Sequence, residues 1–534
     1  MRMCEHNPTR RIGPDLLGLW RILPLLILAF GPPANLACAQ AASQEDVSQQ
    51  IQDLTAAMAR TQAQLEQTQR QLDEMRKQLS ELQRKLAQSG SSAGTQPPPV
   101  PVPASSSQGG SETTSAAIQD IRDRQAMQES QIATQAQSKV ESESKYPVKV
   151  TGLLLLNGFV NTSAVDMAST PTVAISGSGS TGATVRQTIL GIDARGPHLF
   201  GARSYADLRI DFDGNPPSVN SPGGYSGFYN ANATLLRLRT AHAGLQWEHT
   251  DAYFALDRTI LSPDMPTSLT AVAIPALAWS GNLWTWNPQV GITQDFGQAD
   301  SHGVQLQAAL IDVGDAPLSP VAYSSGTPAI PPSSAEESRW PGVEARVALR
   351  GPVVNQNEDR SHFGVGGYFA PHYSSFLGHA YDSWAATLDT RIFLPARLEF
   401  TGNFYRGQAL GGLGGGAYKD FAYRYDADSG GYYFQPLDDV GGWAQLKEKL
   451  SERIEFNTAF GIDNVFADEL RQYAVSGGAL YQNLFRNRTY TVNVIYSPSS
   501  YLQFSLEYRR LTSSTVTGSP ASSNIIGLGA GYQF

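Results

Sequence analysis

The sequence predicts an all-β transmembrane antiparallel β-barrel of about 16 strands, preceded by an α-helical coiled coil. Three observations predict it. Apolar and polar residues alternate over most of the chain's second part, as in strands with two unlike faces. No long apolar stretch follows residue 30, so a membrane-spanning part must be built from strands whose sheet closes. A heptad spacing occupies part of the N-terminal region.

Residues 1–39 are typical of a secretory signal peptide. Arg10 and Arg11 supply positive charge, residues 16–30 form a short apolar run, and residues 37–39 are small, as a cleavage site requires. A membrane anchor and a lipoprotein signal are the alternatives, but the apolar run is short for a membrane span. Both cysteines, Cys4 and Cys38, lie in this segment, so the mature chain is expected to have no disulfide and no thiol chemistry.

Residues 43–88 predict the coiled coil, because apolar residues recur there at alternating steps of three and four. Such a seam calls for partner helices, whereas the alternative, a lone amphipathic helix on a globular core, needs a wider apolar stripe. The seam contains Ile51, Leu54, Met58, Leu65, Leu72, Met75, Leu79, Leu82 and Leu86. Residues 89–145 follow as a Pro-, Ser- and Gly-rich linker, within which a short polar helix is an open alternative.

Residues 146–534 predict the barrel. In the final strand, Ile526, Leu528, Tyr532 and Phe534 alternate with glycine and glutamine, and fifteen similar segments precede it, although fourteen or eighteen strands remain open. A soluble sandwich also alternates. Aromatic residues at strand ends and long connections after odd-numbered strands favour lipid outside. The expected strands are 148–160, 186–195, 203–213, 234–248, 251–258, 287–296, 303–311, 342–350, 361–370, 382–394, 397–406, 441–450, 452–463, 484–497, 500–511 and 524–534.

Signals of enzymes and metal sites are missing from the sequence. The histidines after residue 39 are scattered and form no metal-ligand motif. The glycine-rich run at 177–182 lacks the lysine of a phosphate-binding loop. We therefore expect no catalytic site, metal, cofactor or nucleic-acid partner. From residue 146 onward, 25 Lys and Arg stand against 33 Asp and Glu, which argues against a pore lined by a basic ladder.

The signal peptide, coiled coil, Pro-rich linker and barrel ending in residues 529–534 together resemble Gram-negative trimeric porins with an N-terminal periplasmic coiled coil, the DcaP-like group. Residues 276–284 also resemble a segment of that group. The resemblance implies an outer-membrane homotrimer in contact with lipid, with its coiled coil in the periplasm, that takes up small hydrophilic solutes by passive diffusion. It also implies that Tyr532 and Phe534 are part of the signal read by the barrel assembly machinery.

The resemblance further implies that the loop after the fifth strand, residues 259–286, folds into the lumen and places Asp264 at a constriction. An ordinary outer loop is the alternative. Inward strand positions carry charges of both signs, and Arg209, Arg237 and Arg239 could face Asp257 or Asp264 across the lumen. Salt-bridge packing against the wall is the alternative for them. The wider set of inward charges is Arg195, Asp207, Asp211, Arg258, Arg391, Glu399, Arg406, Glu507 and Arg509.

Two other functions compete with a channel. The barrel could anchor the coiled coil as a tether that reaches toward the periplasm or the peptidoglycan. An outer-membrane hydrolase is the third hypothesis, and the absence of a catalytic constellation disfavours it.

Overall fold

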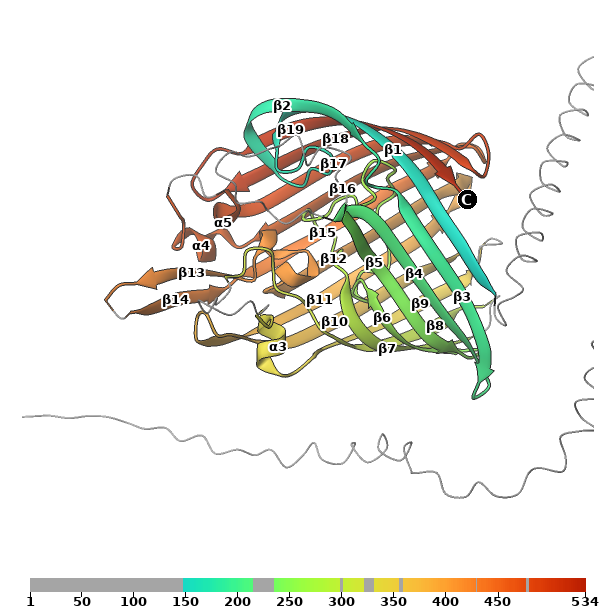
Figure 1. Ribbon diagram of the computed structural model, residues 1–534, viewed down its shortest axis with the longest axis horizontal. Helices are drawn as coiled ribbons and strands as arrows, with labels where there is room; N and C mark the ends of the chain where they lie inside the picture. Colours follow the sequence, from blue (N-terminus) through green and yellow to red (C-terminus); the bar gives the residue numbers. More distant parts are fainter. Residues whose placement is uncertain are drawn as a thin grey trace, which may run out of the picture. The chain divides into compact units, whose positions relative to one another are not determined.

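The computed structural model describes residues 147–214, 235–297, 301–320, 331–354, 359–428, 430–476 and 480–534. Their alternating sequence forms one closed antiparallel sheet and one separate hairpin (Figure 1). The predicted signal peptide, coiled coil and linker lie outside these residues. The sheet strands are β1 (Val148–Val165), β2 (Ala174–Thr184), β3 (Ile189–Leu199), β4 (Ala202–Gly214), β5 (Leu235–Gln246), β6 (Thr250–Asp257), β7 (Asn287–Phe296), β8 (Gly303–Ile311), β9 (Gly342–Val353), β10 (Arg360–Ser374), β11 (His379–Leu394), β12 (Leu398–Gln408), β15 (Asp438–Lys449), β16 (Ile454–Val465), β17 (Leu484–Tyr496), β18 (Leu502–Thr515) and β19 (Ala521–Gln533).

The barrel has sixteen strand positions, because β2 and β3 share one of them. β2 pairs with the second half of β1 and β3 pairs with its first half, so the two strands form one interrupted strand. Every other strand pairs with its sequence neighbour in the sheet, and β19 pairs with β1 to close it. At the seam, Phe534 and Gly152 exchange two backbone hydrogen bonds of 3.0 Å. All sixteen predicted strands lie on strands of the barrel, and the prediction of about sixteen is confirmed.

The two ends of the barrel differ in their connections. Short turns at one end join β3 to β4, β5 to β6 and β17 to β18, while the other end carries the longer loops (Figure 1). Two of the connections expected to be long are short, at 375–378 and 516–520, because β10, β11 and β18 extend further than predicted. The loop after β12 contains the hairpin of β13 (Phe421–Asp426) and β14 (Gly431–Pro436).

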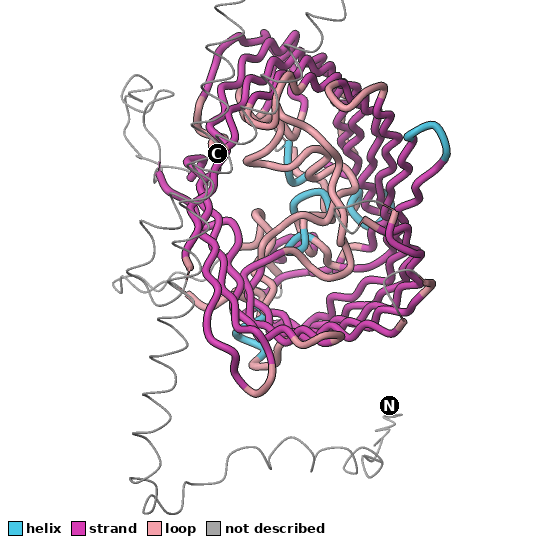
Figure 2. The backbone as a smooth tube through the Cα atoms, turned by 90° about the vertical axis from the view of Figure 1, so that its right-hand side faces the viewer, coloured by secondary structure: helices cyan, strands magenta, loops and turns pink. Residues whose placement is uncertain are grey.

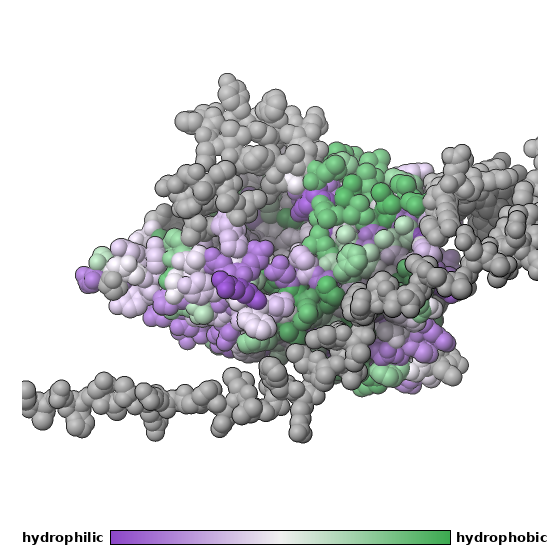
Figure 3. All heavy atoms as spheres, turned by 60° about the horizontal axis from the view of Figure 1, so that its bottom comes forward, coloured by the Kyte–Doolittle hydropathy of each residue, from purple (hydrophilic) through white to green (hydrophobic). Residues whose placement is uncertain are grey.

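The outer face of the barrel is apolar and the inner face is polar. Along β19, Ile526 and Leu528 are exposed while Ile525 and Gly527 are buried, and the same alternation runs through β9, β17 and β18. Figure 3 shows hydrophobic residues gathered on the wall and hydrophilic ones toward the loop end. An apolar outer face is stable in contact with lipid and unfavourable in contact with water, so this arrangement is typical of a membrane barrel. Tyr532 and Phe534 lie on the outer face, 47% and 48% exposed.

Within the described residues, the helices are short and lie in the connections. They are α3 (Ser334–Ser338), α4 (Ala467–Arg471) and α5 (Leu480–Asn483), with the 3₁₀ turns η3 (Pro395–Arg397), η4 (Gly411–Leu413) and η5 (Gly416–Tyr418). None of the helices in the described segments is long and apolar enough to cross a membrane. The buried apolar clusters form where loops pack inside the barrel, around Trp279, Trp284, Leu261 and Leu413. The protein therefore builds its core in its lumen.

Candidate functional site in the barrel lumen

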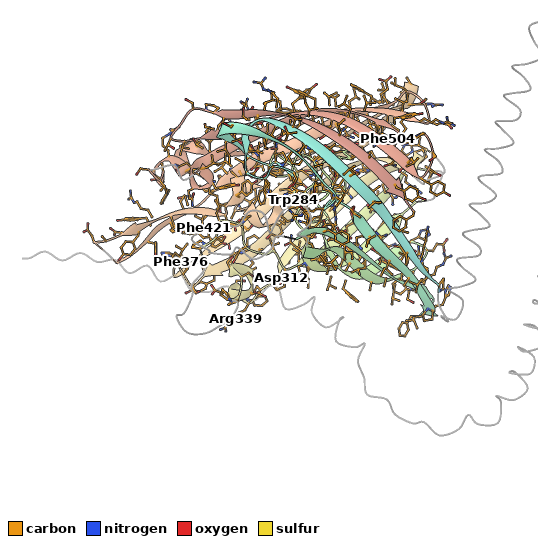
Figure 4. All side chains as sticks on the ribbon, turned by 45° about the horizontal axis from the view of Figure 1, so that its top comes forward. Trp284, Asp312, Arg339, Phe376, Phe421 and Phe504 are labelled. Atoms are coloured by element: carbon orange, nitrogen blue, oxygen red, sulfur yellow. The ribbon has the colours of Figure 1, made fainter. Side chains whose placement is uncertain are left out.

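Two segments fold into the barrel: residues 258–286, here called the inward loop, and residues 409–420, here called the glycine loop. Figure 2 shows loop segments inside the ring of strands, and Figure 4 places Trp284 in the interior and Phe504 on β18. Most side chains of residues 259–286 are buried or half-buried. The inward loop, which connects β6 to β7, therefore narrows the interior of the barrel between its two ends.

The inward loop follows the inner wall across many strands. Near its start, Thr259 donates to the carboxylate of Glu344 on β9. Further on, Ser268 and Thr270 donate to the carboxylate of Glu507 on β18, at 2.6 and 2.7 Å. Because residues on β9 and on β18 hold the same short segment, the loop spans the lumen and does not lie over its mouth.

Asparagine amides on the inner wall bind backbone carbonyls of the inward loop. Asn403 donates to Leu261, Asn493 to Thr267, Asn157 to Leu269 and Asn487 to Trp279, with distances of 2.7, 2.9, 2.7 and 2.9 Å. A buried carbonyl without a partner costs about 1–3 kcal/mol. These amides therefore specify where an irregular segment can lie inside the barrel.

Glycines let the inward loop approach the wall. A Cβ placed at Gly461 would overlap the carbonyl oxygen of Ser280, and one placed at Gly281 would overlap the backbone of Gly442. Gly281 has φ +98°, which a residue with a side chain rarely adopts. Glycine on both segments thus permits the two backbones to come into close contact here.

The glycine loop packs against the inward loop and the wall. Trp279 stacks on Tyr418 with ring centroids 4.1 Å apart, and the Trp284 amide donates to the Leu413 carbonyl at 3.1 Å. The amides of Gly416 and Ala417 donate to the carboxylates of Asp439 and Asp463 on β15 and β16, at 2.8 and 2.7 Å. The two segments therefore form one packed unit.

Lys419 is buried at the base of the glycine loop. Its ammonium group donates to the carbonyls of Ala417, Tyr481 and Leu484, at 2.9, 3.1 and 2.6 Å. Desolvation by burial lowers the pKa of Lys419 to about 7, against the opposing effect of Asp463 and Asp439. Burial likewise raises the pKa of the neighbouring Asp420 carboxyl to about 7.

The predicted arginines lie on the inner wall and are paired there. Arg209 binds Asp193 at 2.6 Å. Arg237 and Arg239 both contact Asp211, at 2.6 and 3.3 Å. Arg237 and Arg239 also donate to the inward loop at the carbonyls of Ala273 and Val272, 2.7 and 2.9 Å away, and lie over the ring of Trp286. Arg237 and Arg239 thus hold the loop as well as carrying charge.

The predicted acids have other partners than these arginines. Asp257 accepts from His242 Nε2 at 2.9 Å, and His242 Nδ1 lies 2.9 Å from Asp207. Asp264, in the inward loop, lies 3.1 Å from His362 Nε2 and 3.4 Å from Arg391. Arg209, Arg237 and Arg239 on one side and Asp257 and Asp264 on the other are therefore each bound to local partners, and a transverse field between the two sets stays a prediction.

Arg258 binds the loop that follows it. Its guanidinium donates to the carbonyls of Ser262 and Asp264, at 2.9 and 3.1 Å, and to Pro263 at 3.3 Å. The group therefore fixes the turn by which the chain leaves β6 and enters the lumen.

A polar cavity of about 300 Å³ lies beside this turn. Asp251 and Asp257 supply carboxylates to its lining, and Tyr205 donates to Asp251 at 2.9 Å. The other lining side chains are mainly neutral and hydrogen-bonding, with His242 and Arg258 as the basic members. Such a lining suits hydrated solutes more than apolar ones.

Sequence reasoning missed His242 and the glycine loop, and placed Arg406 on the wrong face. The β4–β5 ladder shifts register at Arg239, so strict alternation puts His242 on the wrong side. Residues 409–420 carry glycines and no periodic pattern. Arg406 shares its face with the exposed Phe404 and binds Asp438 at 2.5 Å outside the lumen. Its position in step with the apolar Phe400 and Phe404 along the strand would have shown this.

No cluster of three or more His, Cys, Asp or Glu residues that could hold a metal ion occurs in the described part of the chain. The arrangement consists of a barrel wall, a segment that narrows its interior, and a polar and charged lining.

No protein-family model and no curated protein matches the chain. Among solved structures, it is similar to the outer-membrane channel DcaP of Acinetobacter baumannii, with 16% identity, 73% of this chain and 99% of that chain covered, and a TM-score of 0.52. Salmonella typhi OmpF matches with 10% identity, 72% and 97% coverage and a TM-score of 0.41. Pseudomonas putida OprB matches with 10% identity, 72% and 94% coverage and a TM-score of 0.40. The resemblance to the DcaP-like group is thus confirmed in fold: the sixteen-stranded barrel of this chain is similar to the fold of that outer-membrane channel.

Proposed function

We propose that this protein is an outer-membrane porin through which small hydrophilic solutes diffuse passively. The observation that carries the proposal is the inward loop, which lies inside a barrel with an apolar outer face and a polar inner face. A loop in this place sets the width and lining of a water-filled path. No bond chemistry is required of any residue in the lumen.

The charges around the polar cavity support a weak preference for cations. Asp251 is bonded to a neutral phenol, so its negative charge stays available to a solute. Arg258 is turned toward backbone carbonyls. With its excess of acids from residue 146 onward, the barrel should attract small cations more than anions. We assign Asp257, Arg209 and Asp264 to the charged lining of the same path.

Planar-bilayer recording tests the channel directly. Purified refolded protein should give discrete current steps in KCl, and liposomes containing it should swell in small sugars. A protein that inserts, shown by its heat-dependent migration on SDS gels, yet gives no steps would refute the proposal. A potassium-to-chloride permeability ratio of one or less would refute the cation preference alone.

We further propose a homotrimer with a periplasmic coiled coil over residues 43–88. The heptad seam calls for partner helices, and the resemblance implies a trimer. Native mass spectrometry of the full chain and of a variant without residues 43–88 tests both claims. Trimer mass from the full chain supports the homotrimer, and a lower trimer fraction from the shortened chain supports the coiled coil. Monomer mass from the full chain would contradict both.

For biogenesis, we propose that Tyr532 and Phe534 are recognised by the barrel assembly machinery. Both lie on the outer face at the end of the last strand, where an assembly factor can reach them. Replacing both by serine should lower the amount of barrel in the outer membrane, while Tyr501→Ser, in a neighbouring turn, should not. Equal amounts from all variants would contradict the assignment.

A further inference from the structure

The outer face of the barrel has a groove over β12, β15 and β16. It has a volume of about 500 Å³ and a mostly apolar lining. Its floor is formed by Gly442 and Ala444, successive outward positions of β15, where neighbouring strands carry large side chains. Phe404 on one side and Phe460 on the other are 50% and 47% exposed. The groove is therefore a trough between two aromatic walls, open to the surroundings of the barrel.

One arginine lines the groove on the outer face, and two more follow on the neighbouring strands β17 and β18. Arg486 lines its end and donates to Asn464 at 2.6 Å. Arg488 is the register partner of Ile462, which lies in the groove, and Arg510 is the partner of Tyr490 on the next strand. Arg488 and Arg510 are exposed, each between two buried neighbours, so their side chains point outward.

The positive charge of this arginine group is uncompensated. Within the described segments, the side chains of Arg488 and Arg510 have no hydrogen bond or ion pair, and the partner of the Arg486 side chain is a neutral amide. Alternation along β15–β18 places two acids on the same outer face: Glu448, at the end of β15 near the short turns, and Asp438, at its other end. Arg406, level with the groove, is already bound to Asp438.

The arginines also mark a boundary on the outer face. On β17, Arg486 and Arg488 are followed by outward Tyr490, Val492 and Val494 toward the short-turn end. In a membrane barrel, this is where the apolar belt ends and the headgroups begin, on the side of the long loops. Guanidinium groups bind phosphate through paired charge-assisted hydrogen bonds. An apolar trough below such groups offers close van der Waals contact to a lipid acyl chain.

We propose that this surface binds a phosphorylated, multiply acylated lipid of the outer leaflet, of the lipid A type. Arg486, Arg488 and Arg510 hold its phosphate, and one acyl chain lies in the trough over Gly442 and Ala444. The inference rests on the proposed outer-membrane location, but it assigns a site on the opposite face of the wall from the solute path. The positive charge of the arginines favours this anionic lipid over zwitterionic lipids. The apolar trough favours it over free phosphate, which has no acyl chain to fill the trough.

Native mass spectrometry of the full chain in a non-ionic detergent, with added bis-phosphorylated lipid A, tests the site. The triple variant Arg486→Gln/Arg488→Gln/Arg510→Gln should weaken binding about 100-fold, because each arginine is expected to contribute a factor of roughly five to the affinity. Ala444→Leu, which fills the trough, should weaken it several-fold with the arginines intact. The matched control is Arg397→Gln/Lys449→Gln/Arg453→Gln, which removes three exposed cations at the other end of the barrel and should change binding less than twofold.

Four outcomes would overturn the proposal. They are an equal loss in the control variant, equal binding of dephosphorylated lipid A, equal binding of phosphatidylcholine, and a change of oligomer mass in Ala444→Leu, which would make the trough an interface between copies. If the triple variant does not show heat-dependent migration on SDS gels, Arg488→Gln with Ala444→Leu replaces it. Single-channel current from the same samples reports separately on the proposed channel, so failure of one proposal is distinguishable from failure of the other.

Discussion

The two sides of the barrel interior use different residue types. Where the inner wall of β12, β16 and β17 meets the inward loop, it presents amides and glycine, such as Asn403, Asn487 and Gly461. The inner wall of β4–β6 presents charged groups, such as Asp251 and Asp257. The first set satisfies the backbone of a loop and these carboxylates line a cavity, although Arg237 and Arg239 on β5 also bind the loop. Under the proposed function, the amide and glycine side supports the narrowing segment, and the carboxylate side contacts the solute.

Adding bulk on the supporting side should have the largest effect. Gly461→Val would place atoms on the Ser280 carbonyl and cost about 1–3 kcal/mol of packing. We expect the inward loop to detach and single-channel conductance to become larger and noisier. Gly367→Val is the control, because a Cβ there would have its nearest neighbour 3.8 Å away. Equal single-channel conductance and noise in both variants would contradict the claim that this side of the interior supports the inward loop.

Loss of the amides should have a smaller effect in the same direction. Asn493→Ala removes the donor to Thr267 O and a contact with Glu507, leaving a buried carbonyl that costs about 1–3 kcal/mol. Limited proteolysis should then cut within residues 258–286 faster than in the parent protein. Asn524→Ala, on the outer face, serves as the control. Unchanged cleavage in Asn493→Ala would show that the amide does not hold the loop.

Lys419 should make the stability of the unit formed by the inward loop and the glycine loop depend on pH. Its pKa is about 7 in the folded protein and 10.5 as the ordinary value, so between these values the unfolded state binds more protons. Stability should therefore rise as pH increases from about 7 to about 10.5, and level off below 7. Lys419→Met should flatten this slope in a thermal unfolding series followed by tryptophan fluorescence. An identical slope in the variant would contradict the assignment to Lys419.

On the solute-facing side, single charges should act weakly. Asp251→Asn should lower the potassium-to-chloride permeability ratio by about twofold, since a charge in contact with water interacts by no more than about 1 kcal/mol. The reversal potential in a KCl gradient measures it. Asp382→Asn, on an exposed position of β11, should leave the ratio unchanged. A larger change of the permeability ratio in Asp382→Asn than in Asp251→Asn would show that the ions do not pass Asp251.

The strands could be predicted from the sequence, because alternation in segments such as residues 490–496 reflects lipid on one side and water on the other. β2 was missed because its sequence, rich in Ser and Gly, has no apolar face. His242 was missed because a register shift changes which residues point inward. The pairing of Asp264 with His362 and Arg391 depends on the path of an irregular loop, and no periodicity encodes such a path.

The central claim is that the inward loop narrows a conducting path. Its most direct test compares single-channel conductance of the parent protein with that of a variant whose residues 264–283 are replaced by a short Gly-Ser linker. A second variant, lacking the outer β13–β14 hairpin (residues 422–435), controls for loop removal. We predict a several-fold larger conductance for the first variant and an unchanged one for the second. Equal conductance in all three proteins, or no current steps in any, would contradict the account.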